Sequence, residues 1–296
     1  MIGTTVKEKA WLVCAAVTTV LWGVWGALIE LPEKAGFPAT LGYVAWAVTM
    51  IPVAAVALWL IRWDLDRDRR SIALGMSAGL MGCAGQLLLF QCLRIGPAYI
   101  VFPFISLYPV VTIILSVIVL KESASRRAWV GIALAIIAIA MLAYQPANNN
   151  AVSGVLWLVL AVLVFLLWGG QGFIMKFASD SAKSSSMKAE SVTFYLMASS
   201  IVLTPIALVM TDFSGAINWG MRGAWSAVVI QALNAVGFLF FAYAIRLGKA
   251  IIVVPLMSLA PAVTVVISLI LYSIVPHPVT MTGMGLALVS VFLLSE

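Results

Sequence analysis

Long apolar runs, separated by short polar segments, occupy almost the whole 296-residue chain. A helix needs about 20 apolar residues to cross the hydrocarbon core of a bilayer, whereas the strands of a membrane barrel alternate polar and apolar positions. The runs are continuous, so we predict an all-α membrane protein with ten transmembrane helices. The expected spans are 10–30, 39–61, 71–92, 96–120, 126–145, 152–176, 187–211, 221–246, 249–274 and 278–295.

The composition excludes a soluble globular enzyme. Hydrophobic residues make up 64% of the chain and charged residues only 9%, with a mean hydropathy of +1.12, while a soluble domain has about 25% charged residues. The first apolar run is long enough to span and has no small-residue cleavage site behind it, so we expect no cleavable signal peptide. Cys14, Cys83 and Cys92 all fall inside apolar runs, which indicates packing residues and no disulfide framework or zinc site.

The positive charges predict the orientation. With the N-terminus in the cytoplasm, 14 of the 17 Lys and Arg residues lie in cytoplasmic segments, and Lys34, Arg94 and Arg222 lie outside. Because such a bias sets topology, both termini are expected in the cytoplasm. The charges form no continuous face, which argues against nucleic-acid binding. In the loop 64–70, arginines alternate with the carboxylates, so we interpret it as a solvated loop and not a metal site.

The chain repeats itself. A shift of 152 residues aligns Pro103, Ser106, Pro109 and Thr112 with Pro255, Ser258, Pro261 and Thr264, and a shift of 146 aligns Leu21-Trp22-Gly23 with Leu167-Trp168-Gly169. Shared hydrophobicity does not explain prolines, a serine and a threonine in register. Each half holds five spans, an odd number, so residues 1–148 and 149–296 should form two inverted halves. Such repeats are typical of secondary transporters.

The repeated segments resemble the EamA repeat of the drug/metabolite transporter superfamily. The first copy carries Gly96-Pro97-Ala98, Pro103, Pro109, Leu120-Lys121-Glu122, Trp129 and Gly131, and the second carries Gly248, Pro255, Pro261, Gly283 and Gly285. The resemblance implies ten helices in inverted repeats and transport of small organic metabolites by alternating access. It departs in one place: the family pattern has a glutamate after the fourth helix of each half, and the second copy, Tyr272–His277, has none.

Charged residues are expected only near the ends of the spans. Ionisable groups within the membrane would be functional candidates, and a phosphorylated substrate would need Lys or Arg, so we predict a neutral or zwitterionic substrate. Glu30 and Lys176 occupy equivalent ends of the first and sixth spans. They are candidates for gating or coupling, or else snorkel at the helix ends. Arg94 and Arg246 are interpreted as helix-end residues.

The candidate binding residues are uncharged polar and aromatic side chains that helical spacing places on the inward faces of the spans. They are Trp22, Trp25, Gln86, Ser106, Trp168, Gln171, Gln231, Asn234 and Ser258, of which the two serines are chosen because they lie between paired prolines. Gln91, Tyr99, Tyr108 and Tyr243 are in second rank because their faces align less clearly. Stacking and amide hydrogen bonds would suit a planar heterocycle, an aromatic amino acid or a sugar. Core or lipid packing of the tryptophans and interhelical hydrogen bonding of the amides are the alternatives.

The sequence thus predicts a multi-pass transporter of a small neutral or zwitterionic metabolite, with no cofactor and no metal. Its expected partners are the substrate and membrane lipid, as a monomer or homodimer. Compact loops and the lack of an N-x-S/T sequon favour a bacterial inner membrane. A membrane-embedded enzyme is disfavoured because the chain has no GxSxG motif and no His/Glu cluster. A scaffold or receptor would need longer loops.

Overall fold

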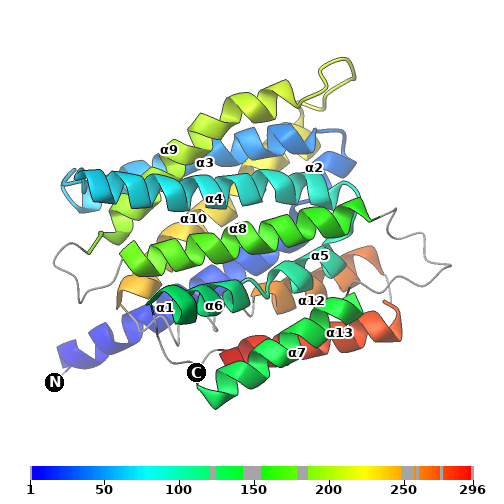
Figure 1. Ribbon diagram of the computed structural model, residues 1–296. Helices are drawn as coiled ribbons and strands as arrows, with labels where there is room; N and C mark the ends of the chain where they lie inside the picture. The colour runs from blue at the N-terminus through cyan, green and yellow to red at the C-terminus, as the bar shows by residue number, and fades with distance from the viewer. Residues whose placement is uncertain are drawn as a thin grey trace.

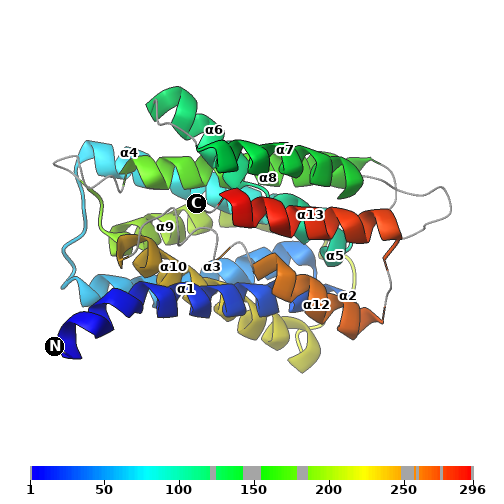
Figure 2. The same ribbon diagram turned by 90° about the horizontal axis from the view of Figure 1, so that it is seen from below.

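The computed structural model describes residues 2–120, 125–142, 155–178, 186–247, 257, 260–273 and 276–294. All regular structure in these ranges is helical. The long helices run roughly side by side, and α7 and α13 lie together at one edge of the bundle (Figures 1 and 2).

The first half contains α1 (Ile2–Leu28), α2 (Leu31–Lys34), α3 (Ala39–Leu60), α4 (Arg69–Leu93), α5 (Ala98–Ile105), α6 (Pro109–Leu120) and α7 (Arg126–Leu142). The second contains α8 (Leu156–Ala178), α9 (Ala189–Val209), the short π-helical turn η1 (Met221–Trp225), α10 (Ser226–Leu247), α12 (Ala260–Tyr272) and α13 (Pro278–Leu294). Among the described residues, seven helical segments are long and apolar enough to cross a membrane. Trp129–Leu142 and Pro278–Ser290 are shorter apolar helices.

One of the predicted spans is interrupted. The run 96–120 forms α5 and α6 with a break at residues 106–108, where the Ser106 hydroxyl donates to the Pro103 carbonyl over 2.7 Å and Pro109 begins α6. Proline lacks the N–H that would continue a helix. The run 10–30 ends before the short helix α2, which carries Pro32 in its first turn. In the first part of the predicted span 249–274, from 249 to 259, the described residues include only Met257.

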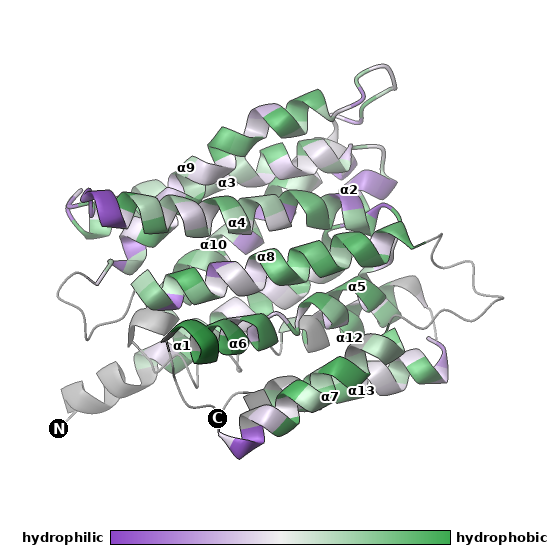
Figure 3. Ribbon diagram, viewed as in Figure 1, coloured by the Kyte–Doolittle hydropathy of each residue, from purple (hydrophilic) through white to green (hydrophobic). Residues whose placement is uncertain are grey.

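The surface between the helix ends is apolar. Figure 3 shows hydrophobic positions along the helices and hydrophilic positions gathered mainly near their ends. Large side chains such as Ile118, Val209 and Ile270 are well exposed to the surroundings. Soluble proteins rarely expose apolar patches of this extent, so the fold is that of an integral, multi-pass membrane protein.

Two equivalent hydrogen bonds join the two halves. Thr112 Oγ1 of α6 donates to the Gly169 carbonyl of α8 over 2.8 Å, and Thr264 Oγ1 of α12 donates to the Gly23 carbonyl of α1 over 2.9 Å. The sequence repeat pairs Thr112 with Thr264 and Gly23 with Gly169. Each glycine lets the partner helix approach closely, because a Cβ there would collide with Val111 or Val263.

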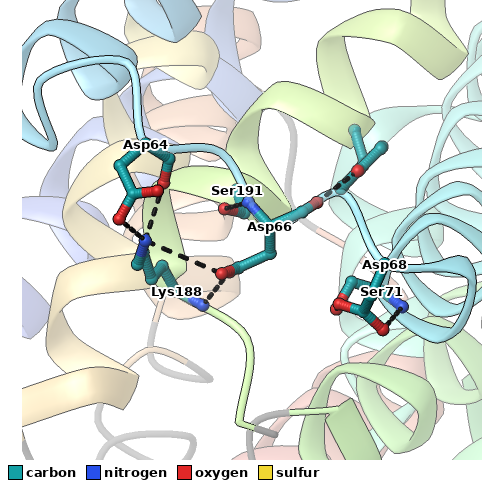
Figure 4. A network of polar contacts seen from close by, with 7 residues as sticks. Asp64, Asp66, Asp68, Ser71, Lys188 and Ser191 are labelled. Carbon is teal, nitrogen blue, oxygen red and sulfur yellow. Dashed lines mark hydrogen bonds and ion pairs between the residues drawn. The ribbon is translucent and has the colours of Figure 1, made fainter.

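A polar network at one end of the bundle joins the loop between α3 and α4 to the start of α9 (Figure 4). Lys188 Nζ pairs with Asp64 Oδ2 at 2.6 Å, and the Lys188 backbone N–H donates to Asp66 Oδ2 over 2.8 Å. The Asp66 backbone N–H donates to Ser191 Oγ over 3.1 Å. The hydrogen bond from Lys188, aided by its charge, lowers the pKa of the exposed Asp64 carboxyl below its usual value.

The acidic residues of this loop are therefore engaged by the protein. Asp68 caps α4, where its Oδ2 accepts the Ser71 backbone N–H over 3.0 Å. Part of the positive charge beside these carboxylates comes from Lys188, which is distant in sequence. Within the described ranges, no three His, Cys, Asp or Glu side chains are grouped as metal ligands.

Replacing Asp66 by alanine is expected to lower the melting temperature of the purified protein by about 2–4 °C. The backbone N–H of Lys188 at the start of α9 loses its carboxylate acceptor, and loss of such a hydrogen bond costs about 1 kcal/mol. Thermal unfolding in detergent measures the change. Asp212→Ala is the control, because the Asp212 side chain accepts bonds from Ser214 within the same exposed loop. Equal shifts in both variants would contradict the prediction.

Candidate functional site

A cavity of about 120 Å³ lies between the two halves. Its lining comes from α1, α3, α4, α5, α8, α9, α10 and α12, together with Met257 and the break between α5 and α6. It therefore lies where helices of both halves meet, the position at which repeat-built transporters bind their substrates.

Most of the predicted binding residues line this cavity. They are Trp22, Trp25, Gln86, Ser106, Trp168, Gln171 and Asn234, joined by Tyr108 from the second rank. Gln231 lies behind the lining, where its buried Oε1 accepts a hydrogen bond from Trp25 Nε1 at 2.9 Å. Ser258 lies outside the described residues.

Three second-rank candidates do not line the cavity. Tyr99 is buried in the core of the bundle. Gln91 Oε1 accepts a bond from Arg94 Nη1 at 3.2 Å, and the Tyr243 hydroxyl donates to Glu190 Oε1 over 3.1 Å. Their faces align less clearly than those of the other candidates, and in the structure Gln91 and Tyr243 bond to charged residues that do not line the cavity.

Glu30 and Lys176 also lie outside the cavity lining. Glu30 is only 5% exposed; its Oε1 accepts the Ala98 backbone N–H over 2.6 Å, and its Oε2 pairs with Lys34 Nζ at 2.6 Å. The carboxylate thus lies at the positive end of α5. Lys176 is half-buried in the last turn of α8. Arg94 ends α4 as expected and also pairs with Glu33 at 3.2 Å.

Sequence reasoning missed part of the aromatic lining. Trp46, Phe102, Phe238 and Phe241 all contribute to it, and none of them is among the predicted binding residues. Trp46 is the most consequential, since its Nε1 donates to Asn234 Oδ1 over 2.8 Å. A signal was present: Trp46 lies within its span, away from the interfaces where tryptophans commonly anchor.

Two of the cavity tryptophans make equivalent bonds. Trp22 Nε1 donates to the Asn234 carbonyl over 3.2 Å, and Trp168 Nε1 donates to the Gly82 carbonyl over 3.3 Å. In the sequence repeat, Trp22 aligns with Trp168, and Gly82 aligns with Asn234. These bonds fix both rings between the halves, since each joins a helix of one half to a helix of the other.

The cavity is nevertheless asymmetric in its chemistry. The repeat equivalent of Trp25 is Gln171, and that of Asn234 is Gly82. Gln171 packs directly on Gly82, where a Cβ would collide with its amide. One side of the cavity therefore presents a tryptophan and an asparagine where the other presents a glutamine and a glycine.

The lining carries no formal charge. None of its described residues is Asp, Glu, Lys, Arg or His, and its polar side chains are amides, hydroxyls and indoles. A bound ion would lose its hydration without gaining a counter-charge, which is unfavourable in a buried site. The arrangement can bind a small organic molecule by aromatic contact and a few hydrogen bonds.

The model of the EamA-like transporter family matches the chain twice, over residues 9–144 and 154–296. The comparison with curated proteins gives no match. Among solved structures, one described as "Crystal structure of protein" has a TM-score of 0.66 and 16% sequence identity, and the match covers 96% of this chain and 95% of that one. This likeness shows a shared fold. The two family matches cover most of the chain, and the protein therefore belongs to the EamA-like transporter family, whose members are membrane transporters of the drug/metabolite type.

Proposed function

We propose that this protein moves a small neutral or zwitterionic organic metabolite across a bacterial inner membrane by alternating access at the central cavity, as a monomer or homodimer. The observation that carries the proposal is an uncharged, aromatic cavity enclosed by equivalent positions of both halves. An exchange of conformation between the two halves would open such a site first to one side of the membrane and then to the other.

The proposed topology has ten spans in two inverted five-helix halves, 1–148 and 149–296, with both termini in the cytoplasm. Contacts between loops support it. Lys188 pairs with Asp64, and the charge bias assigns both to the cytoplasmic side. Asn218 Nδ2 donates to the Ala35 carbonyl over 2.8 Å, and the same bias assigns both to the outer side. The reciprocal Thr–Gly contacts agree with an inverted relation.

A thermal-shift screen followed by a flux assay tests the function. Amino acids, nucleobases, nucleosides, sugars and amines are added to the purified protein, and a compound that binds the folded state raises its melting temperature. Liposomes that contain the protein should then take up that compound saturably, while empty liposomes should not. A compound that stabilises the protein without any flux would contradict transport. Stabilisation by anions alone, dependent on Arg94 or Lys176, would contradict the central site.

Replacing Trp22 by leucine is expected to lower the initial rate of uptake about tenfold, which corresponds to about 1.4 kcal/mol. The variant loses the indole bond to the Asn234 carbonyl and the ring contact with Phe241, whose centroid lies 5.4 Å away. Uptake into liposomes at equal protein density measures the loss. Trp129→Leu is the control, because Trp129 is exposed on α7. Comparable losses in both variants would show that the effect does not arise in the cavity.

A further inference from the structure

The side chain of Gln86 lines the cavity, and its amide nitrogen has no partner in the part of the chain that the structure describes. Gln86 lies on α4, is only 3% exposed and belongs to the lining. Its Nε2 atom has no hydrogen-bond partner among the described residues. Buried polar groups in proteins are nearly always hydrogen-bonded, so a donor left unpaired at a cavity wall indicates that the acceptor comes from a bound molecule.

Other donors of the lining are already engaged by the protein. The indole N–H groups of Trp22, Trp168 and Trp25 bond to the Asn234 carbonyl, the Gly82 carbonyl and Gln231 Oε1. The Trp46 N–H and the hydroxyls of Ser106 and Thr264 also have protein acceptors. The tryptophan rings are therefore left to offer their apolar surfaces, and directed hydrogen bonds are left to the amides of Gln86, Gln171 and Asn234 and to the hydroxyl of Tyr108.

The shape and charge of the lining further restrict the chemical class of the ligand. Aromatic side chains of both halves surround the space, including Trp22 and Tyr108 from the first and Trp168 and Phe238 from the second. Such surfaces favour a flat ring system. A zwitterion would bury an ammonium and a carboxylate with no counter-charge in the lining. A sugar would bring many hydroxyls to a lining that is largely aromatic and apolar.

We propose that the central cavity binds a neutral, planar heteroaromatic molecule whose carbonyl or ring-nitrogen acceptor receives the hydrogen bond of Gln86 Nε2. This inference rests on the proposed function, and it narrows the substrate from neutral or zwitterionic metabolites to neutral heteroaromatic ones. The acceptor fixes the orientation of the molecule, while the aromatic rings supply most of the contact area.

Calorimetric titration of the purified protein with matched probes tests the substrate class. Nicotinamide and quinolin-2-one are neutral and carry a carbonyl; nicotinate and quinoline-2-carboxylate are their anionic counterparts, and phenylalanine and tryptophan are zwitterions. We expect at least one neutral probe to bind tenfold or more tightly than its carboxylate and the amino acid of matching size. Equal or tighter binding of the carboxylate or the amino acid would overturn the proposal, as would failure of both neutral probes to bind.

A pair of glutamine variants tests the hydrogen bond. Gln86→Leu removes the donor and should weaken binding of the neutral probe about 3–10-fold. Gln91→Leu is a matched control, because Gln91 lies on the same helix and its Nε2 is also buried without a partner, but it does not line the cavity. We expect its affinity for the probe to be unchanged. Equal losses in the two variants, or no loss in Gln86→Leu, would overturn the assignment of Gln86.

Flux measurements separate this inference from the proposed function. If a neutral probe binds with the expected dependence on Gln86 but does not cross liposomes containing the protein, the ligand assignment stands and transport fails. If liposomes transport an amino acid or a sugar while neither neutral probe binds, transport stands and the ligand assignment is wrong.

Discussion

Replacement of Asn234 by leucine is expected to lower the initial rate of substrate uptake into liposomes several-fold or more, because it releases the Trp46 ring at the wall of the cavity. Asn234 Oδ1 accepts the indole N–H of Trp46 at 2.8 Å, and Trp46 is only 3% exposed. Leucine leaves that donor buried and unpaired at the cavity wall, which costs about 1–3 kcal/mol. The backbone carbonyl of residue 234 still accepts from Trp22, so the pairing of α1 with α10 should persist.

A double-mutant cycle gives this prediction its control. Trp46→Phe removes the donor and leaves Asn234 without that bond, so it should also slow uptake. Combined with Asn234→Leu, it leaves neither an unpaired donor nor an unpaired acceptor, and such paired replacements are often nearly neutral. The double variant should therefore recover part of the rate lost in Asn234→Leu. A fully additive loss would mean that the two side chains act independently.

The regular parts of the fold follow from local sequence. Continuous apolar runs predicted the helices, because a backbone in lipid must satisfy its own hydrogen bonds. The repeat also predicted which residues would behave alike: Trp22 and Trp168 make equivalent bonds, as do Thr112 and Thr264. Such equivalences can be read from a sequence because both copies encode the same local contact.

Partners between distant helices were not predictable in the same way. Helical spacing assigns a residue to a face but does not say which helix that face meets. Trp46 illustrates this, because α3 is apolar on all sides and its sequence marks no inward face. The contact of Glu30 with the Ala98 backbone depends likewise on where α5 begins relative to the end of α1. Lys188 reaches Asp64 only because α9 starts beside the loop that follows α3.

Replacement of Gly169 by alanine is expected to lower the stability of the folded protein. The new Cβ would collide with Val111 and lie 2.8 Å from the Tyr108 carbonyl oxygen, a backbone atom that a rotamer change cannot move. Overpacking of this kind costs about 1–3 kcal/mol. It would also strain the hydrogen bond from Thr112 to the Gly169 carbonyl. The melting temperature and the monodisperse fraction after purification should both fall.

Two further glycines turn this expectation into a test of the repeat. Gly285→Ala on α13 meets no atom within 4 Å, so it should leave stability unchanged or raise it by up to about 1 kcal/mol through helix propensity. Gly23→Ala should resemble Gly169→Ala, because its Cβ would collide with Val263 and lie 3.0 Å from the Ala260 carbonyl oxygen. If Gly169→Ala behaved like Gly285→Ala, α6 and α8 could not cross as closely as the structure has them. If only one of Gly23→Ala and Gly169→Ala lowered the stability, the two helix crossings would not contribute equally to the stability of the fold. A simple exchange of conformation between the halves could then not account for alternating access.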